Sequence, residues 1–471
     1  MSSDDDPPES HPSAHITAVV LAAGRGERLR SELPKPLFPI CGRAMSSHVL
    51  HALAESGIGR AVVVVPPGER GERIEQALRA DAPCLELRFV VQQQPRGTAD
   101  AVLAARSAVN TPLLCVVNGD LPLLIPVQIR PVLCQSDADA VITTAVVDHP
   151  GKMGRIVRDE KGQLEGIVEH RDADRAERSI REVNVGLYLF RAEFLWSTLE
   201  RIAEQASDGE AYVTDAIPRA IRDDRAIAVA VELPDGRLNV ETPADAADAE
   251  LVVRQRIVDR LLESGVHIRD RRATWIDARA WVESGALIEP GCHIRGLSTI
   301  GAHSKIGPNA IIEDSQIGSR SVLESCTVRG SDLGDQVEVG PYSTIRPGCA
   351  IDSHVHIGTH AELKDARIGA HVQIGHFSYI GDADVGARTN IGAGAITCNF
   401  DGESKQRTVI GEDAFIGSDT MLVAPLSIGN RARTGAGAVV TRDVPDDGNA
   451  VGHPARLTPA RRSRAGEERG P

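Results

Sequence analysis

The chain has 471 residues, with 66 acidic and 52 basic side chains and a formal net charge of -14 at pH 7. This length predicts two or three domains, and the negative balance argues against a nucleic-acid partner. Aromatic residues make up only 3% of the chain, which argues against a surface of stacked rings.

The chain also lacks the signals of export. We see no apolar run long enough to cross a bilayer, and the acidic N-terminus has no basic or apolar region of a signal peptide. Eight scattered cysteines, without the spacing of a zinc site, predict unreactive thiols in a reducing compartment. We therefore expect a cytoplasmic protein with no membrane insertion.

The first half of the chain has the pattern of an α/β domain. Residues 1–14 are rich in Ser, Asp and Pro and are expected to form a disordered tail. Short apolar runs then alternate with amphipathic stretches, and the runs occupy residues 16–23, 61–67, 113–120 and 140–147. This alternation predicts a Rossmann-like, mostly parallel sheet covered by helices over residues 15–245. Residues 246–264 have helical spacing without Gly or Pro, which predicts a linker helix.

The sequence pattern changes after residue 264, where an aliphatic residue recurs at multiples of about six positions and is often followed by glycine. Such a period is typical of a parallel β-helix, in which each short strand turns one aliphatic side chain inward. We expect this fold over residues 265–455, with a projecting loop between Ile396 and Ile410 and a mobile basic tail at 456–471. The repeated positions are Ile300, Ile306, Leu333, Val339, Ile345, Ile351, Ile357, Leu363, Ile368, Ile374, Ile380, Val385, Ile391, Ile410, Ile416, Leu422 and Ile428.

The segment LAAGRGERL follows the first apolar run and has the character of a phosphate loop. Gly24 and Gly26 permit close approach of backbone N–H groups to phosphate oxygens. Arg25, Arg28 and Lys35 supply the positive charge that a triphosphate requires. The segment therefore predicts a nucleotide site.

A second motif, Asn118-Gly119-Asp120, closes another apolar run. Asp120 is therefore expected at the carboxyl edge of the sheet, where open α/β sheets bind ligands. A carboxylate there can hold Mg²⁺ against phosphate oxygens, although in isolation the motif would serve equally well as a cap for the next turn.

One histidine of the β-helix is a candidate base. His376 follows a turn glycine, so its side chain could point outward toward a neighbouring chain. Imidazole suits the removal of a proton from an amine that attacks a thioester. Most of the 15 histidines are expected to be structural, and we assign surface or turn positions to His354, His356, His360 and His371.

Taken together, the motifs resemble sugar-nucleotide pyrophosphorylases, and specifically the bacterial family of bifunctional N-acetylglucosamine-1-phosphate uridylyltransferases and glucosamine-1-phosphate N-acetyltransferases. The likeness runs from about residue 16 to 453. It rests on LAAGRG, LPKPL, QxxxxGTA, NGD, MGRI, GIVEH, EVNVG and GRLN in the first half, and on IRPG, HIGTHAELKDARIG, IGHFSYIGDADVG, NIGAGAITCNFDG, IGSDTMLVAP and VTRDVP in the second. The resemblance implies a left-handed β-helix and a homotrimer with active sites between chains.

In the first half, the resemblance implies a site for UTP, Mg²⁺ and an amino-sugar phosphate. Lys35 would bind the nucleotide phosphates, and Asp120 with Asn239 would bind Mg²⁺. The positions implied for the nucleotide are Leu21, Ala22, Ala23, Gly24, Gln92, Gly97 and Thr98, together with Asn118 and Gly119 of the NGD motif. Those implied for the sugar are Gly154, Glu169 and Asn184.

In the second half, the resemblance implies acetyl transfer from acetyl-CoA, with His376 as the general base. The positions implied for glucosamine 1-phosphate are Arg346, Lys364, Tyr379 and Asn390. Those implied for acetyl-CoA are Ala393, Asn399, Phe400, Ser418, Ala436 and His453.

The chain departs from the family pattern at four positions. Glu27 stands where Thr is expected, and Asn118 where an aromatic residue is common; the added carboxylate repels a triphosphate mildly. Phe400 stands for Tyr and His453 for Arg, which predicts weaker CoA binding, the lost hydroxyl costing about 1 kcal/mol. Two alternatives remain open: a single-activity nucleotidyltransferase for another sugar or NTP with a structural β-helix, and a non-catalytic regulatory subunit.

Overall fold

The computed structural model describes residues 15–205, 210–223, 225, 227–232, 239–453 and 455–458. The chain divides into two compact units, residues 1–253 and 254–471. The tail expected at 1–14, and all of the basic tail except its first three residues, lie outside the described residues. Those three residues form β40 (Arg456–Thr458), which pairs antiparallel with β39 (Asn449–Val451). The sequence analysis predicted no strand in this tail, and β40 forms because the chain folds back onto an otherwise open strand edge.

The first unit is built around one sheet with the strand order β11-β7-β10-β6-β1-β4-β5. Only β10 along this order runs antiparallel to its neighbours β6 and β7, so the expected mostly parallel sheet is confirmed. The strands are β1 (Ile16–Leu21), β4 (Arg60–Val65), β5 (Glu86–Val91), β6 (Leu113–Asn118), β7 (Ala140–Val146), β8 (Arg155–Arg158), β9 (Leu164–Val168), β10 (Glu182–Arg191) and β11 (Ile227–Glu232), with a small hairpin of β2 (Pro39–Ile40) and β3 (Arg43–Ala44).

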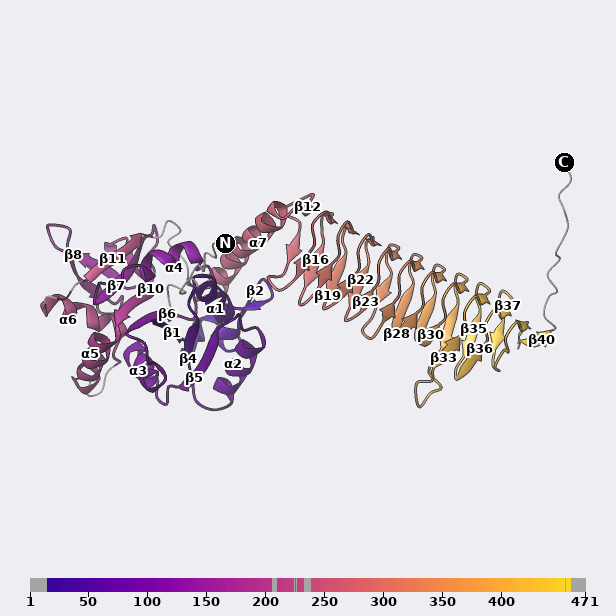
Figure 1. The fold of residues 1–471 in the computed structure, drawn as a ribbon, viewed down its shortest axis with the longest axis horizontal. Helices are drawn as coiled ribbons and strands as arrows, with labels where there is room; N and C mark the ends of the chain where they lie inside the picture. Colours follow the sequence, from indigo (N-terminus) through magenta and orange to yellow (C-terminus); the bar gives the residue numbers. More distant parts are fainter. Residues whose placement is uncertain are drawn as a thin grey trace, which may run out of the picture. The chain divides into compact units, whose positions relative to one another are not determined.

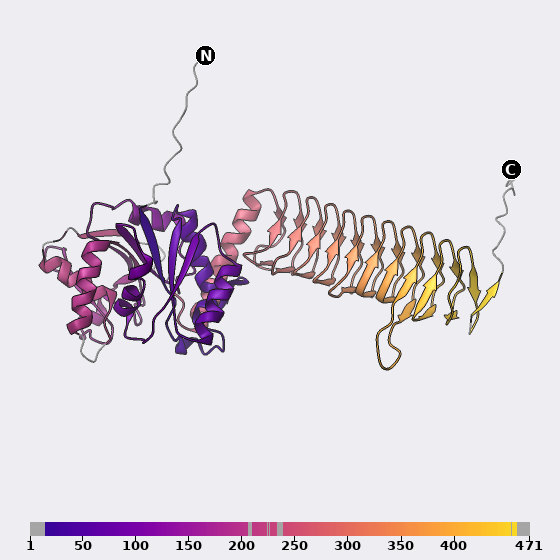
Figure 2. The same cartoon turned by 60° about the horizontal axis from the view of Figure 1, so that its bottom comes forward.

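Helices lie on both sides of this sheet (Figure 2), which explains why its central strands are almost continuously apolar. Short 3-10 turns η1 (Glu27–Leu29), η2 (Lys35–Leu37) and η5 (Val213–Asp215) lie near the strand ends. The α-helices are α1 (Met45–Glu55), α2 (Glu69–Ala80), α3 (Thr98–Ala104), α4 (Pro126–Leu133), α5 (Ala192–Gln205), α6 (Ala216–Arg222) and α7 (Pro243–Glu263). Among the described helices, none combines the length and apolar character needed to cross a bilayer.

Helix α7 contains the boundary between the two units. It begins at a proline, which lacks the N–H that the first helical position leaves unpaired. Just before it, Thr242 and Asp245 exchange backbone-to-side-chain hydrogen bonds of 2.9 and 3.2 Å, a reciprocal cap. Farther along, Glu250 accepts the backbone N–H of Cys41 at 2.8 Å, which ties the helix to the hairpin of the first unit.

The second unit is a parallel β-helix of stacked coils (Figure 1), as the six-residue period predicts. All the repeated aliphatic residues are buried, so the inward assignment is confirmed. Short strands pair in register from coil to coil and form three faces. Face 1 contains β12 (His267–Ile268), β15 (Leu287–Ile288), β18 (Lys305–Ile306), β21 (Val322–Leu323), β24 (Glu338–Val339), β27 (His356–Ile357), β29 (Gln373–Ile374), β31 (Asn390–Ile391), β34 (Phe415–Ile416), β37 (Arg433–Thr434) and β39.

Two longer strands, β28 (Glu362–Ile368) and β30 (Tyr379–Val385), run across both remaining faces. Face 2 contains their first halves with β13 (Trp275–Ile276), β16 (His293–Arg295), β19 (Ile311–Glu313), β22 (Thr327–Arg329), β25 (Thr344–Ile345), β32 (Ile396–Cys398), β35 (Met421–Val423) and β38 (Val439–Val440). Face 3 contains their second halves with β14 (Trp281–Val282), β17 (Thr299–Ile300), β20 (Gln316–Ile317), β23 (Asp332–Leu333), β26 (Ala350–Ile351), β33 (Thr408–Ile410) and β36 (Leu426–Ile428).

Candidate active sites

A cavity of about 550 Å³ lies at the carboxyl ends of β1 and β6. These parallel strands pair Leu21 with Asn118, and the Gly119 N–H donates to the Leu21 carbonyl at 3.0 Å. The phosphate loop and the NGD motif therefore meet at one edge of the sheet, where such sheets bind ligands. The predicted residues in the wall are Leu21, Ala22, Gly24, Lys35, Thr98, Asn118, Gly119 and Asp120.

The phosphate loop packs closely against the residues that follow it. Gly26 has φ +67°, and a Cβ there would lie 2.4 Å from the Lys35 Cβ, so the turn requires glycine. The Arg70 guanidinium donates to the carbonyls of Gly24 and Arg25 at 3.1 and 2.6 Å. Gly24 itself has open space where a Cβ would stand, which leaves its backbone accessible from the cavity.

Asp120 has two oxygen atoms with different surroundings. Oδ2 lies 2.5 Å from the Lys35 ammonium, whereas Oδ1 is buried and has no hydrogen-bond partner among the described residues. The Asp120 carbonyl accepts the Val240 N–H at 3.0 Å, which places Asn239 beside Asp120. Because a buried unpaired carboxylate oxygen is costly, its position suits a hard cation held by oxygen ligands from these two residues.

The three predicted sugar residues also lie together. Asn184 donates its backbone N–H to the Gly154 carbonyl at 2.9 Å, and a Cβ on Gly154 would lie 3.4 Å from Glu169 Oε1. The Thr214 hydroxyl donates to the same oxygen at 3.2 Å. Burial raises the pKa of Glu169, and the Thr214 hydrogen bond opposes that shift. The next residue back, Val213, donates to Thr98 Oγ1 at 2.9 Å and connects this cluster to the cavity wall.

Two predicted nucleotide residues support the wall rather than line it. Gln92 is buried and donates to the Gly97 carbonyl at 3.0 Å and to Asp100 Oδ2 at 2.9 Å. Gly97 has φ +98°, and a Cβ there would lie 2.2 Å from the Ala211 carbonyl oxygen. Both residues therefore fix the turn that presents Thr98.

Three acidic or aromatic wall residues were missed in the sequence analysis: Glu210, Tyr212 and Glu241. The Tyr212 hydroxyl donates to Glu210, and the Arg171 guanidinium lies 4.7 Å from the Tyr212 ring centre. Glu241 makes a two-pronged ion pair with Arg28, one hydrogen bond being 2.7 Å long. These two residues are 213 positions apart, and neither carries a local motif that would have predicted the contact.

On the β-helix, three of the four predicted amino-sugar residues lie on face 2. Arg346 donates to Glu362 at 2.9 Å, and Lys364 lies 3.7 Å from Asp382. Tyr379 belongs to the neighbouring strand β30. The fourth residue, Asn390, lies on strand β31 of face 1.

A further cation, Lys405, was missed in the sequence analysis. It comes from the loop that leaves the β-helix between β32 and β33, as Figures 1 and 2 show. The close approach of the positively charged Lys364 ammonium lowers the pKa of Lys405, and the Arg346 charge adds to this effect. Three neighbouring cations suit a phosphate group. The polar break in the period was the signal for the loop, but it did not single out this residue.

Four predicted residues of the acetyl-transfer site form one column at the corner between faces 1 and 2. His376, Ala393, Ser418 and Ala436 each follow a glycine. A Cβ on Gly375 would lie 2.4 Å from the Ala393 nitrogen, and the corresponding distances from Gly392 to Ser418 and from Gly417 to Ala436 are 2.5 and 2.7 Å. The four residues therefore stand on successive coils, and the column needs glycine beside it.

His376 points away from the core of the β-helix and is exposed. Its Nδ1 accepts the backbone N–H of Thr359 at 2.9 Å, and the Thr359 hydroxyl lies 3.3 Å from the same atom. In the neutral ring that makes this bond, the proton resides on Nε2.

The remaining predicted acetyl-CoA residues are dispersed within this chain. Asn399 contacts Asp382, and its Nδ2 lies 3.4 Å from the Tyr379 hydroxyl, so it joins the amino-sugar group. Phe400 is 62% exposed in the projecting loop. His453 is exposed in the turn that follows β39.

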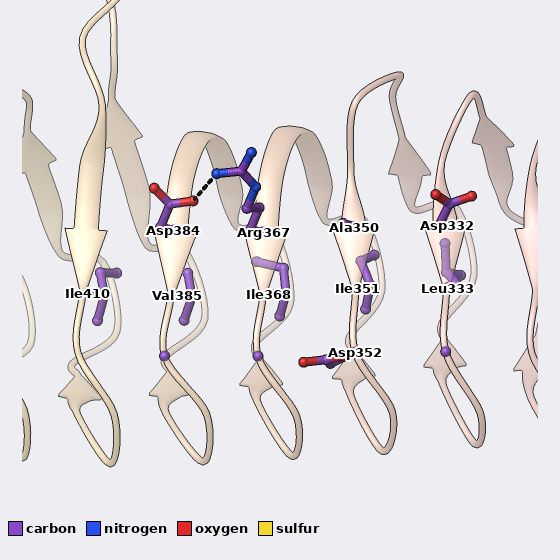
Figure 3. Close-up of a pocket in the computed structure, with 13 residues that line it drawn as sticks. Asp332, Leu333, Ala350, Ile351, Asp352, Arg367, Ile368, Asp384, Val385 and Ile410 are labelled. Atoms are coloured by element: carbon purple, nitrogen blue, oxygen red, sulfur yellow. Dashed lines mark ion pairs between the residues drawn. The ribbon is translucent and has the colours of Figure 1, made fainter.

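A larger depression of about 800 Å³ lies on face 3 and contains none of the predicted site residues. Figure 3 shows the Arg367 and Asp384 side chains on neighbouring strands, 3.9 Å apart, and Asp332 two strands away from Arg367, beyond the strand of Ala350. Glycines of the repeat, namely Gly334, Gly369 and Gly386, also line it.

The fold and the first cavity define a nucleotidyltransferase unit joined to a hexapeptide-repeat unit. The family model described as nucleotidyl transferase matches residues 17–247, and the model described as bacterial transferase hexapeptide (six repeats) matches residues 407–442.

Similarity to curated proteins extends over nearly the whole chain. The bifunctional protein GlmU of Heliobacterium modesticaldum is 39% identical over 442 residues, 92% of this chain and 95% of that protein. Those of Sorangium cellulosum and Stutzerimonas stutzeri are 39% and 38% identical, each over 93% of this chain and over 93% and 96% of their own lengths. The chain therefore belongs to the family of bifunctional GlmU proteins. It is a uridylyltransferase and acetyltransferase of UDP-N-acetylglucosamine synthesis, which disfavours both alternatives.

Proposed function

We propose that the cavity of the first unit transfers a uridylyl group from Mg²⁺-bound UTP to N-acetylglucosamine 1-phosphate. The observation that carries this proposal is the buried Oδ1 of Asp120, which has no partner within the described part of the chain and lies beside Asn239 in a cavity walled by the phosphate loop. Asp120 and Asn239 would hold Mg²⁺, which supplies charge neutralisation at the phosphates. The Lys35 ammonium forms an ion pair with the same carboxylate. When the metal binds there, Lys35 would leave Asp120 and bind a phosphate oxygen.

The reaction requires positioning more than covalent chemistry. An oxygen of the sugar phosphate attacks the α-phosphorus, the bond to the bridging oxygen breaks, and pyrophosphate leaves. Glu169 and Asn184 would orient the sugar, with Thr214 holding the Glu169 carboxyl in place. Tyr212 and Glu210 belong to the same cavity wall as the phosphate loop, although they are distant from it in the sequence.

The second unit would acetylate glucosamine 1-phosphate. Arg346, Lys364 and Lys405 would bind the phosphate, and acetyl-CoA would lie along the column of Ala393, Ser418 and Ala436. The amine nitrogen attacks the thioester carbonyl, the C–S bond breaks, and CoA leaves as the thiol after taking up a proton.

His376 would remove the amine proton, but the Thr359 contact constrains how it does so. Because Nδ1 accepts an N–H, the neutral ring offers a donor rather than an acceptor at Nε2. We infer that the hydrogen bond from Thr359 to Nδ1 is broken in the substrate complex, either because Thr359 moves away or because the imidazole ring rotates. An unprotonated ring nitrogen is then available to the amine.

We also propose a homotrimer in the cytoplasm. Asn390 on face 1 and the phosphate-binding cations on face 2 flank one corner, and a site that uses both is readily completed by a second chain. Tyr342 and Phe377 near this corner are 69% and 65% exposed, which favours a protein contact there. The eight cysteines, all of them among the described residues, form no disulfide, which suits a reducing compartment.

The test is a panel of nucleotides. Steady-state assays with UTP, dTTP and other NTPs against N-acetylglucosamine 1-phosphate are expected to give the highest kcat/KM with UTP. Removal of Mg²⁺ is expected to abolish turnover. A preference for dTTP with glucose 1-phosphate would instead support a nucleotidyltransferase of another specificity.

A further inference from the structure

The cavity of the first unit is neutralised by its own side chains. Among the described residues that line it, three are cationic (Arg25, Arg28 and Lys35) and four are acidic (Glu27, Asp120, Glu210 and Glu241), so the formal balance is 3 − 4 = −1. Each cation has a carboxylate partner in the same wall: Arg25 with Glu27 at 3.8 Å, Lys35 with Asp120 at 2.5 Å, and Arg28 with Glu241. A polyanion that binds to these three cations must displace their carboxylate partners.

Two of the three ion pairs are readily opened: a bound cation favours the release of Lys35, and the opening of the Arg25–Glu27 pair costs little free energy. A cation bound by Asp120 takes over the charge that Lys35 now neutralises, which releases Lys35. The Arg25 and Glu27 side chains are 70% and 78% exposed, so water screens their contact and opening it costs little.

Arg28 is different, because Glu241 holds it with two hydrogen bonds and is only 27% exposed. Two hydrogen bonds also hold the backbone at Glu241. Its own N–H donates to Asp245 Oδ2 at 3.1 Å, and the preceding Val240 N–H donates to the Asp120 carbonyl at 3.0 Å. Release of Arg28 therefore requires the Glu241 side chain to swing away while the backbone stays in place.

We propose that Glu241 is an affinity-setting residue that competes with the nucleotide's phosphates for Arg28. This inference rests on the proposed uridylyl-transfer site and adds an internal competitor to it. Substrate binding is then an exchange in which the triphosphate displaces a carboxylate. The partly exposed pair is weak enough for a multiply charged phosphate to break, yet it lowers the affinity for every nucleotide that must break it.

The test compares UTP dissociation constants, measured by isothermal titration calorimetry with Mg²⁺, for the full-length protein and its variants. Glu241→Gln keeps the shape and removes the charge, and it is expected to bind UTP about threefold to fivefold more tightly. Glu200→Gln is the matched control, because it breaks the exposed Arg106–Glu200 pair elsewhere in the same unit and is expected to leave the constant unchanged.

A double-variant comparison establishes whether Glu241 acts through Arg28. In an Arg28→Ala background, the Glu241→Gln change is expected to have no effect on UTP affinity. Glu241→Ala serves as a second variant if the Gln variant does not fold. Weaker or unchanged UTP binding by the folded Glu241 variants would overturn the competition and leave the site intact, whereas a wild-type protein that fails to bind UTP would overturn the site itself.

Discussion

The hydrogen bond at Nδ1 of His376 is the contact that most constrains the chemistry of the second unit. It accepts the Thr359 N–H, and that bond is compatible with two roles for the ring. The ring could remove a proton from the substrate amine, or it could serve mainly to hold the Thr359 turn in place. A substitution that preserves one role and removes the other separates them.

Substitution of His376 by Asn tests these roles. The Asn side chain places an acceptor near the Nδ1 position, so it can keep the Thr359 hydrogen bond, but it has no titrating group. We expect both His376→Asn and His376→Ala to lose acetyl transfer by at least about 100-fold, the lower end for a general base. CoA thiol release with glucosamine 1-phosphate measures this. If the Asn variant recovers most of the activity that Ala loses, the ring is a structural anchor rather than a base.

Lys405 is expected to contribute to phosphate binding through charge. Because it lies beside Lys364, replacement by Gln removes one of the neighbouring cations and should raise the KM for glucosamine 1-phosphate about fivefold to tenfold. The KM for acetyl-CoA should not change. Lys305→Gln, an exposed lysine on β18, is the control and should alter neither constant. An unchanged KM in the Lys405 variant would remove this residue from the site.

At the scale of elements, the sequence predicted most where the signal is local. The strands β1, β6 and β7 lie within the expected apolar runs, and β4 begins one residue before its run, because a strand buried on both faces must be continuously apolar. The β-helix followed from its period. By contrast, the Arg28–Glu241 pair joins a loop to the segment before α7, and no spacing within one sequence encodes such a contact. The resemblance implied that Asp120 and Asn239 act together, whereas no local pattern encodes the Val240 hydrogen bond that brings their backbones side by side.

Helix α1 contains a group that should make the first unit sensitive to acid. Burial lowers the pKa of His48 to about 4, although its Nε2 bond of 2.8 Å to the Ile40 carbonyl opposes the shift. Between the ordinary value of 6.5 and about 4, the unfolded chain binds more protons than the folded chain. The free energy of unfolding should therefore fall, by at most about 3 kcal/mol, as the pH drops through this window.

His48→Gln should flatten that dependence, since Gln can donate the same hydrogen bond from its amide nitrogen but does not titrate. The midpoint of urea unfolding of the first unit, measured at pH 7.5 and 4.5, gives the comparison. The difference between the two midpoints should be smaller in the variant than in the wild type. Equal differences would assign the acid sensitivity to other groups.

At the scale of the whole molecule, the two proposed sites belong to separate compact units. Asp120 lies in residues 1–253, and His376 lies in residues 254–471, with each site built from its own unit's strands. Each unit has its own buried core, so a local change in one site has no evident route to the chemistry of the other. The family relationship predicted both activities, whereas the composition alone predicted only the number of domains.

Single substitutions should therefore separate the activities. Asp120→Asn removes a metal ligand's charge and is expected to abolish pyrophosphate formation while leaving acetyl transfer within about twofold of the wild type. His376→Ala is expected to do the reverse. Both reactions are measured on the same preparation, by pyrophosphate release and by CoA thiol release. Loss of both activities from either change would contradict the model of independent sites.

The glycines beside the His376 column determine the distance between adjacent coils. Because Gly375, Gly392 and Gly417 leave no room for a side chain, adjacent coils approach at the spacing of neighbouring β-strands, roughly 4.8 Å. Three such steps separate His376 from Ala436, a span of roughly 14 Å. If acetyl-CoA lies along this column as proposed, a repeat gained or lost within this stretch would change the length of the acyl carrier that fits by one whole coil, while the buried interior is preserved.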